Sequence, residues 1–276
     1  MLANINNYFI RLSIKSMTKE ISKSKIGLFV PCYMDLLYPE AALKSLKFLE
    51  HLNLNVSFLY NLTCCGQPFF NSGETEKGKF FMEKVLNILN EYDYIIVLAA
   101  SCTSMVKNHY QHFISNINTQ TELKNKVYEF TEFLYDIYKI HKSKINLVQN
   151  KKVSILYSCH GLRELQLAKS SELRTNNINK VTEILNKIKG LEIVEIEMWD
   201  ECCGFGGTFS YYENDLSIKM GKDLLNKFIN KNIDAILGYD LSCLTHLKTI
   251  TKQQNREVEF FYIGEILYNS LSFTME

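Results

Sequence analysis

The eight cysteines of this 276-residue chain fall into two sets that share one order. In each set a single cysteine comes first, an adjacent pair follows, and a fourth cysteine ends the set. The first set is Cys32, Cys64, Cys65 and Cys102, and the second set is Cys159, Cys202, Cys203 and Cys243. The residues around the pairs repeat too, as CCGQPFF and CCGFGGTF. A repeat on this scale predicts two halves built on one plan.

Short apolar runs stand directly before the first and last cysteine of each set. They read IGLFV, YIIVLAA, VSILY and IDAILGY, and they begin at residues 26, 94, 153 and 233. Runs of this length predict buried strands of a parallel sheet. Segments with helical periodicity lie between them, so we expect an α/β fold with mostly parallel strands, flanking helices and two pseudo-repeated halves. Every cysteine then lies at the carboxyl end of a strand, where open α/β sheets bind their ligands.

Three segments carry the strongest helical signals: 38–52, 74–92 and 214–231. Pro39 stands in the first turn of the first segment, where its missing N–H costs no hydrogen bond. The expected buried stripe of this helix consists of Leu43, Leu46, Leu49 and Leu52. A further stripe predicts a helix within 111–150, and it consists of Val127, Phe130, Leu134 and Ile137.

We expect three segments along the chain. Residues 1–25 form an N-terminal extension, residues 26–150 form the first cysteine-rich half, and residues 151–276 form the second. Residues 111–150 carry few strand signals and are expected to join the two halves. Met17 is an alternative start of the chain, and neither start carries chemistry.

The charge of the chain is balanced, with 31 Lys and Arg against 30 Asp and Glu and a formal net charge of +1 at pH 7. A nucleic-acid partner is not expected, because no basic block supplies the necessary electrostatic attraction. No apolar run approaches the roughly 18 to 20 residues needed to cross a bilayer. We therefore expect a cytoplasmic protein with reduced thiols, whose association with a membrane is at most peripheral.

Four converging thiols have several chemical uses. A structural zinc ion takes four thiolates, but the usual C-x2-C spacing is absent and adjacent cysteines reach one ion with difficulty. A disulfide between Cys64 and Cys65 would close a strained small ring, and a nucleophilic cysteine would leave seven others unexplained. An iron–sulfur cluster suits an adjacent pair best, because the two thiolates bind different irons of one object. The glycine after each pair, Gly66 or Gly204, would let backbone N–H groups approach the cluster.

These motifs resemble those of the CCG domains, which are cysteine-rich modules with a C…CCG…C-x-x-C pattern. CCG domains are found in the cysteine-rich subunit of heterodisulfide reductase, in glycolate oxidase iron–sulfur subunits and in lactate-utilisation proteins. The stretches CCGQPFFNSG, SCTSM, SCH and CCGFGGTFS are most similar to the lactate-utilisation protein A branch. The resemblance covers roughly residues 26–270.

The resemblance implies an iron–sulfur electron-transfer subunit of an oxidoreductase complex. Such a subunit works with other subunits in the oxidation of L-lactate to pyruvate and has no complete active site of its own. The alternatives are a subunit acting on glycolate, glycerol 3-phosphate or a heterodisulfide, or a non-redox protein whose thiols hold structural zinc. Neither a dinucleotide fingerprint nor a P-loop is present, so no nicotinamide, flavin or ATP site is predicted.

The resemblance also implies which residues bind one or two 4Fe–4S clusters. One cluster would be held by Cys32, Cys64, Cys65 and Cys102, and a second by Cys159, Cys202, Cys203 and Cys243. The pattern departs at Ala99 and Asp240, where each half lacks one cysteine of the final C-x-x-C. Four thiols for each site favour a cubane over the five-thiolate noncubane cluster of heterodisulfide reductase.

Three side chains near the cysteines have open roles. Asp240 is either a ligand in place of the missing thiol or a helix cap. His160 could carry a proton or bond to cluster sulfide, or it could be an ordinary polar group with a partner. Arg163 could bind a carboxylate substrate or pair with a surface acid. No catalytic residue is assigned.

Overall fold

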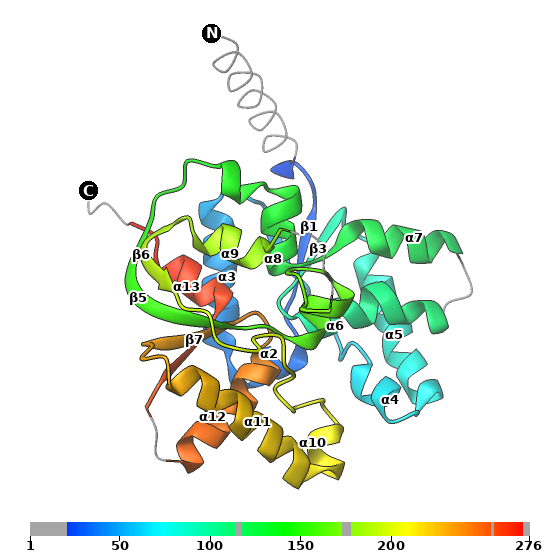
Figure 1. Cartoon of the computed structure of the whole chain (residues 1–276). Coiled ribbons are helices and arrows are strands. Elements are labelled where there is room, and N and C mark those ends of the chain that lie inside the picture. Colours follow the sequence, from blue (N-terminus) through cyan, green and yellow to red (C-terminus); the bar gives the residue numbers. More distant parts are fainter. Residues whose placement is uncertain (1–20, 114–116, 173–177, 255–256, 273–276) are drawn as a thin grey trace.

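The computed structural model describes residues 21–113, 117–172, 178–254 and 257–272 (Figure 1). Most of the expected N-terminal extension, including Met17, lies outside the described residues. Within the described ranges, no helix is both long enough and apolar enough to cross a bilayer.

The first half alternates strands with helices. Its strands are β1 (Ile26–Phe29), β2 (Val56–Phe58), β3 (Tyr94–Val97) and β4 (Val127–Glu129). Its α-helices are α2 (Cys32–Leu37), α3 (Pro39–His51), α4 (Gln67–Asn71), α5 (Thr75–Leu89), α6 (Ala100–Ser104), α7 (Ile117–Lys126) and α8 (Phe130–Glu132). Short π or 3-10 turns are η1 (Met105–His109), η2 (Tyr110–His112), η3 (Phe133–Ile137) and η4 (Ile140–Lys142).

The second half repeats this alternation, and its first strand begins at Leu147, inside the range 26–150 expected for the first half. Its strands are β5 (Leu147–Leu156), β6 (Ile188–Ile193), β7 (Ala235–Gly238) and β8 (Glu259–Tyr262). Its helices are η5 (His160–Glu164), α9 (Lys180–Leu185), α10 (Phe209–Tyr212), α11 (Asn214–Ile229), α12 (Leu241–Gln253) and α13 (Ile263–Asn269).

Each half forms a four-stranded sheet in which the strands run parallel. The strand orders are β2-β1-β3-β4 and β6-β5-β7-β8, so the second sheet repeats the topology of the first. Leu28 of β1 lies opposite Ile96 of β3, and Ile155 of β5 lies opposite Leu237 of β7. The predicted α/β class with two pseudo-repeated halves is confirmed.

Side chains alternate between the two faces of the first sheet, as the geometry of a strand requires. Leu28 and Ile96 face the large core that both halves share, whereas Phe29 and Val97 face a second core. Val85 of α5 is fully buried in that second core. Both faces of the sheet are therefore covered, which explains why its strands read as continuous apolar runs.

The predicted leucine stripe of 38–52 is wrong in part. Helix α3 begins at Pro39 as expected, but Leu43 is 43% exposed, whereas Phe48 and Leu49 are fully buried. Successive residues of a helix are about 100° apart, so a spacing of three residues drifts by about 60° at each step. Leucines at that spacing leave the buried face, and residues spaced alternately by three and four form it instead.

A second difference concerns Val127, which the apolar spacing assigned to a helix. Val127 begins strand β4, and α8 and η3 follow directly after it. Phe130 and Leu134 are fully buried, as the stripe predicted. A strand of three residues is too short to produce a period of its own in the sequence.

The two halves meet through paired helices and through the edge strands of the sheets. Helices α3 and α13 pack together near the middle of the molecule (Figure 1). Gly264 of α13 lies against Ser45 of α3, where a Cβ would overlap the serine hydroxyl. Phe130, after β4, packs on Tyr262 of β8, with ring centroids 6.1 Å apart. The carboxyl ends of β4 and β8 therefore meet at this junction.

Candidate metal centres

At the carboxyl end of the first sheet, four thiols lie side by side and form the first quartet: Cys32, Cys64, Cys65 and Cys102. Cys32 begins α2 after β1, the adjacent pair follows β2, and Cys102 lies in α6 after β3. Cys32 hydrogen-bonds with Cys64, and Cys64 with Cys65. Cys65 Sγ donates to Cys102 Sγ at 3.3 Å. Three strand ends thus deliver four sulfur atoms to one place.

Gly66 and Tyr110 position the adjacent pair of the first quartet. Gly66 has a φ of +88°, a left-handed conformation that favours glycine, and its N–H donates to Cys64 Sγ. Tyr110 is fully buried and donates its hydroxyl proton to the carbonyl oxygen of Cys65 at 3.0 Å. The glycine was expected beside the thiols, but no motif in the sequence marks Tyr110.

The second quartet repeats the arrangement at the carboxyl end of the second sheet: Cys159, Cys202, Cys203 and Cys243. Cys159 and Cys203 each hydrogen-bond with Cys202, and Cys203 also hydrogen-bonds with Cys243. Gly204 has a φ of +86° and donates its N–H to Cys202 Sγ at 3.4 Å. The contacts follow the same order as in the first quartet. All eight cysteines are free thiols.

Hydrogen bonds between thiols dominate the ionisation of both quartets. The bond with Cys64, together with burial, raises the pKa of Cys32 well above its usual range. In the second quartet the bond with Cys202 raises the pKa of both Cys159 and Cys203. These two hydrogen bonds hold the pKa of Cys202 well below its usual range. The thiol hydrogen bonds therefore favour ionisation of Cys202 over ionisation of Cys159 or Cys203.

The donor set of each quartet fits an iron–sulfur cluster. Each quartet offers four soft sulfur ligands, and the glycine N–H groups donate to sulfur, as hydrogen bonds that tune such clusters do. Cys65, Cys203 and Cys243 are buried, whereas Cys32 is exposed. In the part of the chain that the structure describes, no three His, Cys, Asp or Glu side chains surround a point as ligands of one ion would. The role of the eight cysteines as cluster ligands stays a prediction.

The residue after the first cysteine of each quartet reaches across to the other half. His160, after Cys159, lies with its Nε2 3.0 Å from Gln67 Nε2, and Gln67 directly follows the first CCG motif. Tyr33, after Cys32, packs its ring 6.5 Å from the ring of Phe205, which directly follows the second CCG motif. Both quartets therefore adjoin the same junction between the halves. His160 has a polar partner in Gln67, as the more ordinary of its two expected roles requires, and its Nδ1 also lies 3.7 Å from Cys159 Sγ, as a role beside a cluster would require.

Asp240 and Arg163 also take the more ordinary of their expected roles. Asp240 is 3% exposed and caps α12, because its Oδ1 accepts a hydrogen bond from Ser242 N at 3.2 Å. Arg163 pairs with the exposed Glu172, with 2.8 Å between Nη2 and Oε1. The helix-cap and surface-pair interpretations are the ones that fit these contacts.

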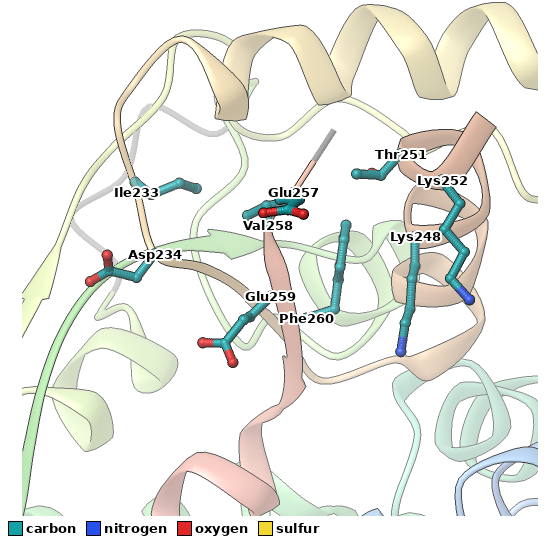
Figure 2. A pocket seen from close by; sticks show the side chains of 9 residues that line it. All are labelled: Ile233, Asp234, Lys248, Thr251, Lys252, Glu257, Val258, Glu259 and Phe260. Atoms are coloured by element: carbon teal, nitrogen blue, oxygen red, sulfur yellow. The ribbon is translucent and has the colours of Figure 1, made fainter. Parts of the chain in front are cut away.

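A hollow of about 500 Å³ lies at the other end of the second sheet (Figure 2). Its walls include Lys248 and Lys252 of α12, Glu259 of β8 and Asp234 just before β7. These residues mark the amino ends of β7 and β8, whereas the second quartet follows the carboxyl ends of its strands. No cysteine lines the hollow, so it is separate from the candidate metal centres.

Comparisons with known proteins agree with the duplicated arrangement. The cysteine-rich (CCG) domain profile matches twice, at residues 26–107 and 153–248. Lactate utilization protein A of Geobacillus kaustophilus is 31% identical over 246 residues, which cover 88% of this chain and 98% of that protein. Lactate utilization protein A 1 of Bacillus mycoides is 29% identical over 247 residues, which cover 88% of this chain and 96% of that protein.

A solved structure of a hypothetical protein from Helicobacter pylori shares the fold. It superposes with a TM-score of 0.63 and 11% sequence identity, and the match covers 94% of this chain. The chain spans about half of that protein, because the match covers 54% of it. At this identity the similarity concerns the fold alone.

Proposed function

The chain belongs to the cysteine-rich CCG domain family, and on that premise we propose that it is an iron–sulfur electron-transfer subunit in the oxidation of L-lactate to pyruvate. The relatives named lactate utilization protein A support the substrate, since they match this chain over nearly their whole length. Oxidation of L-lactate to pyruvate releases two electrons and two protons. We assign that step to a partner subunit and the passage of electrons to this chain.

The observation that carries the proposal is the contact of four thiols in each half. The first quartet would hold one cluster and the second quartet another, each as a 4Fe–4S cubane. When bound, a cluster of this kind accepts and releases one electron at a time. The glycine N–H groups at Cys64 and Cys202 would stabilise negative charge on sulfur, and the burial of Cys65 and Cys203 would keep water away from two ligands of the sites.

Substitution of one buried ligand in each quartet tests the proposal. In protein purified without oxygen, Cys65→Ser should remove the electron-spin-resonance signal of one reduced cluster, and Cys203→Ser the signal of the other. Leu89→Ala, in the core of the first half, controls for loss of stability without loss of a ligand. Equal iron content in both serine variants and the wild type would contradict the assignment of ligands.

The substrate is tested by reduction of the oxidised protein in cell extract. L-lactate should reduce the clusters faster than glycolate or glycerol 3-phosphate at the same concentration. Reduction by glycolate or glycerol 3-phosphate but not by L-lactate would agree with the electron-transfer role and reject L-lactate as the substrate. No reduction by any of the three would reject the role in hydroxy-acid oxidation.

A further inference from the structure

Asp240 is a buried carboxylate that binds backbone groups of both halves. It follows β7, separated from its last residue by Tyr239 alone, and it is 3% exposed. Its Oδ1 accepts hydrogen bonds from Ser242 N at 3.2 Å and from Ser242 Oγ at 2.6 Å. This oxygen therefore caps α12 in the second half, where the first N–H groups of a helix lack partners within the helix.

The other oxygen of Asp240 caps a helix of the first half. Asp240 Oδ2 accepts a hydrogen bond from Ser101 N at 2.9 Å, and Ser101 lies in the first turn of α6. Ala99 occupies the N-cap position of α6, and its side chain has no acceptor. The first half thus lacks a capping side chain at the position where the second half has Asp240, and Asp240 serves both helices.

The two helices that Asp240 caps carry the last thiol of each quartet. Cys102 lies one residue after Ser101 in α6, and Cys243 lies one residue after Ser242 in α12. We propose that Asp240 is a positioning residue that fixes Cys102 and Cys243 together, so that the geometry of both metal sites depends on one carboxylate. This inference rests on the proposed function, because it requires that the quartets bind clusters.

The carboxylate of Asp240 also lies close to the thiols, because its two oxygens bind the residues directly before Cys102 and Cys243. A buried negative charge beside a cluster disfavours the addition of an electron, because the charges are screened weakly in the interior. Asp240 should therefore lower the reduction potential of the neighbouring clusters, an effect that a simple structural cap would not have.

The test compares Asp240→Asn with a matched control, Asp234→Asn. Asparagine keeps one oxygen that can accept from Ser242 N, but its amide NH2 cannot accept from Ser101 N. Asp234 stands at the opposite end of β7, and its Oδ2 likewise accepts a backbone hydrogen bond, from Lys152 N at 2.7 Å. The control therefore removes the same charge and the same kind of bond at a place remote from the thiols.

Each cluster is followed separately in protein that retains only that cluster. The Cys203→Ser background retains the first cluster, and the Cys65→Ser background retains the second. In Asp240→Asn a chelator should remove iron about fivefold faster from the first quartet, as loss of one helix cap implies, with little change in the second. The reduction potentials of both clusters should rise. Asp240→Ser, which keeps a capping oxygen for α12, gives a second variant if the asparagine variant does not fold.

The outcomes separate the inference from the proposed function. If the wild type binds no iron, the proposed function fails. If the wild type binds clusters, and Asp240→Asn matches Asp234→Asn in iron release and in both potentials, the positioning role is overturned. A lowered unfolding temperature with unchanged potentials and unchanged iron release would overturn it as well, because Asp240 would then be a structural cap only.

Discussion

Glu129 should make the stability of the protein depend on pH, and Glu129→Gln should remove that dependence. The side chain is fully buried at the end of β4, and burial raises its pKa from 4.5 to about 8. Its Oε2 accepts hydrogen bonds from Thr131 N at 2.6 Å and Glu132 N at 3.2 Å, while its Oε1 has no partner in the described structure. The protonated form is therefore the one that the folded protein favours.

The magnitude follows from the two pKa values of Glu129. In the unfolded chain the carboxyl ionises near 4.5, whereas in the folded protein it ionises near 8. The contribution to stability is complete below pH 4.5 and is lost as the pH rises to 8, since ionisation then favours the unfolded chain. At about 1.4 kcal/mol for each pKa unit, the loss amounts to about 5 kcal/mol.

Urea unfolding of the apo-protein between pH 5 and pH 9 measures this effect. At pH 5 the free energies of unfolding of the wild type and Glu129→Gln should agree within about 1 kcal/mol, the scale of one hydrogen bond. At pH 9 the glutamine variant should be the more stable protein by several kcal/mol. Glu83→Gln, at an exposed position of α5, is the control. If wild type and Glu129→Gln lose stability in parallel as the pH rises, the reasoning is refuted.

Two further predictions concern residues that shape the CCG loops. Tyr110→Phe should lower the free energy of unfolding by about 1 to 3 kcal/mol, because it leaves the buried carbonyl oxygen of Cys65 without a donor. A chelator should then remove iron faster from the first quartet alone. Equally faster removal from both quartets would contradict the local role of Tyr110. Gly73→Ala should lower the free energy of unfolding by about 1 kcal/mol, because Gly73 has a positive φ but open space around the added Cβ. Gly204→Ala should lower it by about twice that or more, measured by thermal unfolding, because its Cβ would also lie 2.7 Å from the Ser217 carbonyl oxygen. Equal losses in the two variants would refute the steric explanation.

The sequence predicted the features that repeat locally along the chain. Apolar runs followed by cysteines predicted parallel strands that end at thiols, and the carboxyl ends of parallel strands necessarily share one edge of a sheet. The grouping of Cys32 with Cys102 therefore followed from topology alone. The role of the glycine after each pair was also expected, because a residue without a side chain lets backbone N–H groups approach a bound cluster.

Features that depend on contacts between the halves could not be predicted. The bond from Ser101 N to Asp240 joins residues that lie 139 positions apart, and no local pattern encodes it. The same holds for the contact of Gln67 with His160 of the other half, 93 positions away. Within the first half, it holds for the bond from Tyr110 to the Cys65 carbonyl oxygen, 45 positions away. The exposure of Leu43 in α3 reflects a different limit: a spacing of three residues suggests a stripe, but the packing of α3 against α13 decides which face is buried.

The most direct test of the central claim is the content of iron, acid-labile sulfide and zinc in protein purified without oxygen. Two 4Fe–4S clusters predict about eight irons and about eight sulfides for each chain, with a brown colour that bleaches on reduction. Stoichiometric zinc with no iron, even after anaerobic reconstitution with iron and sulfide, would contradict the claim that the two quartets bind iron–sulfur clusters.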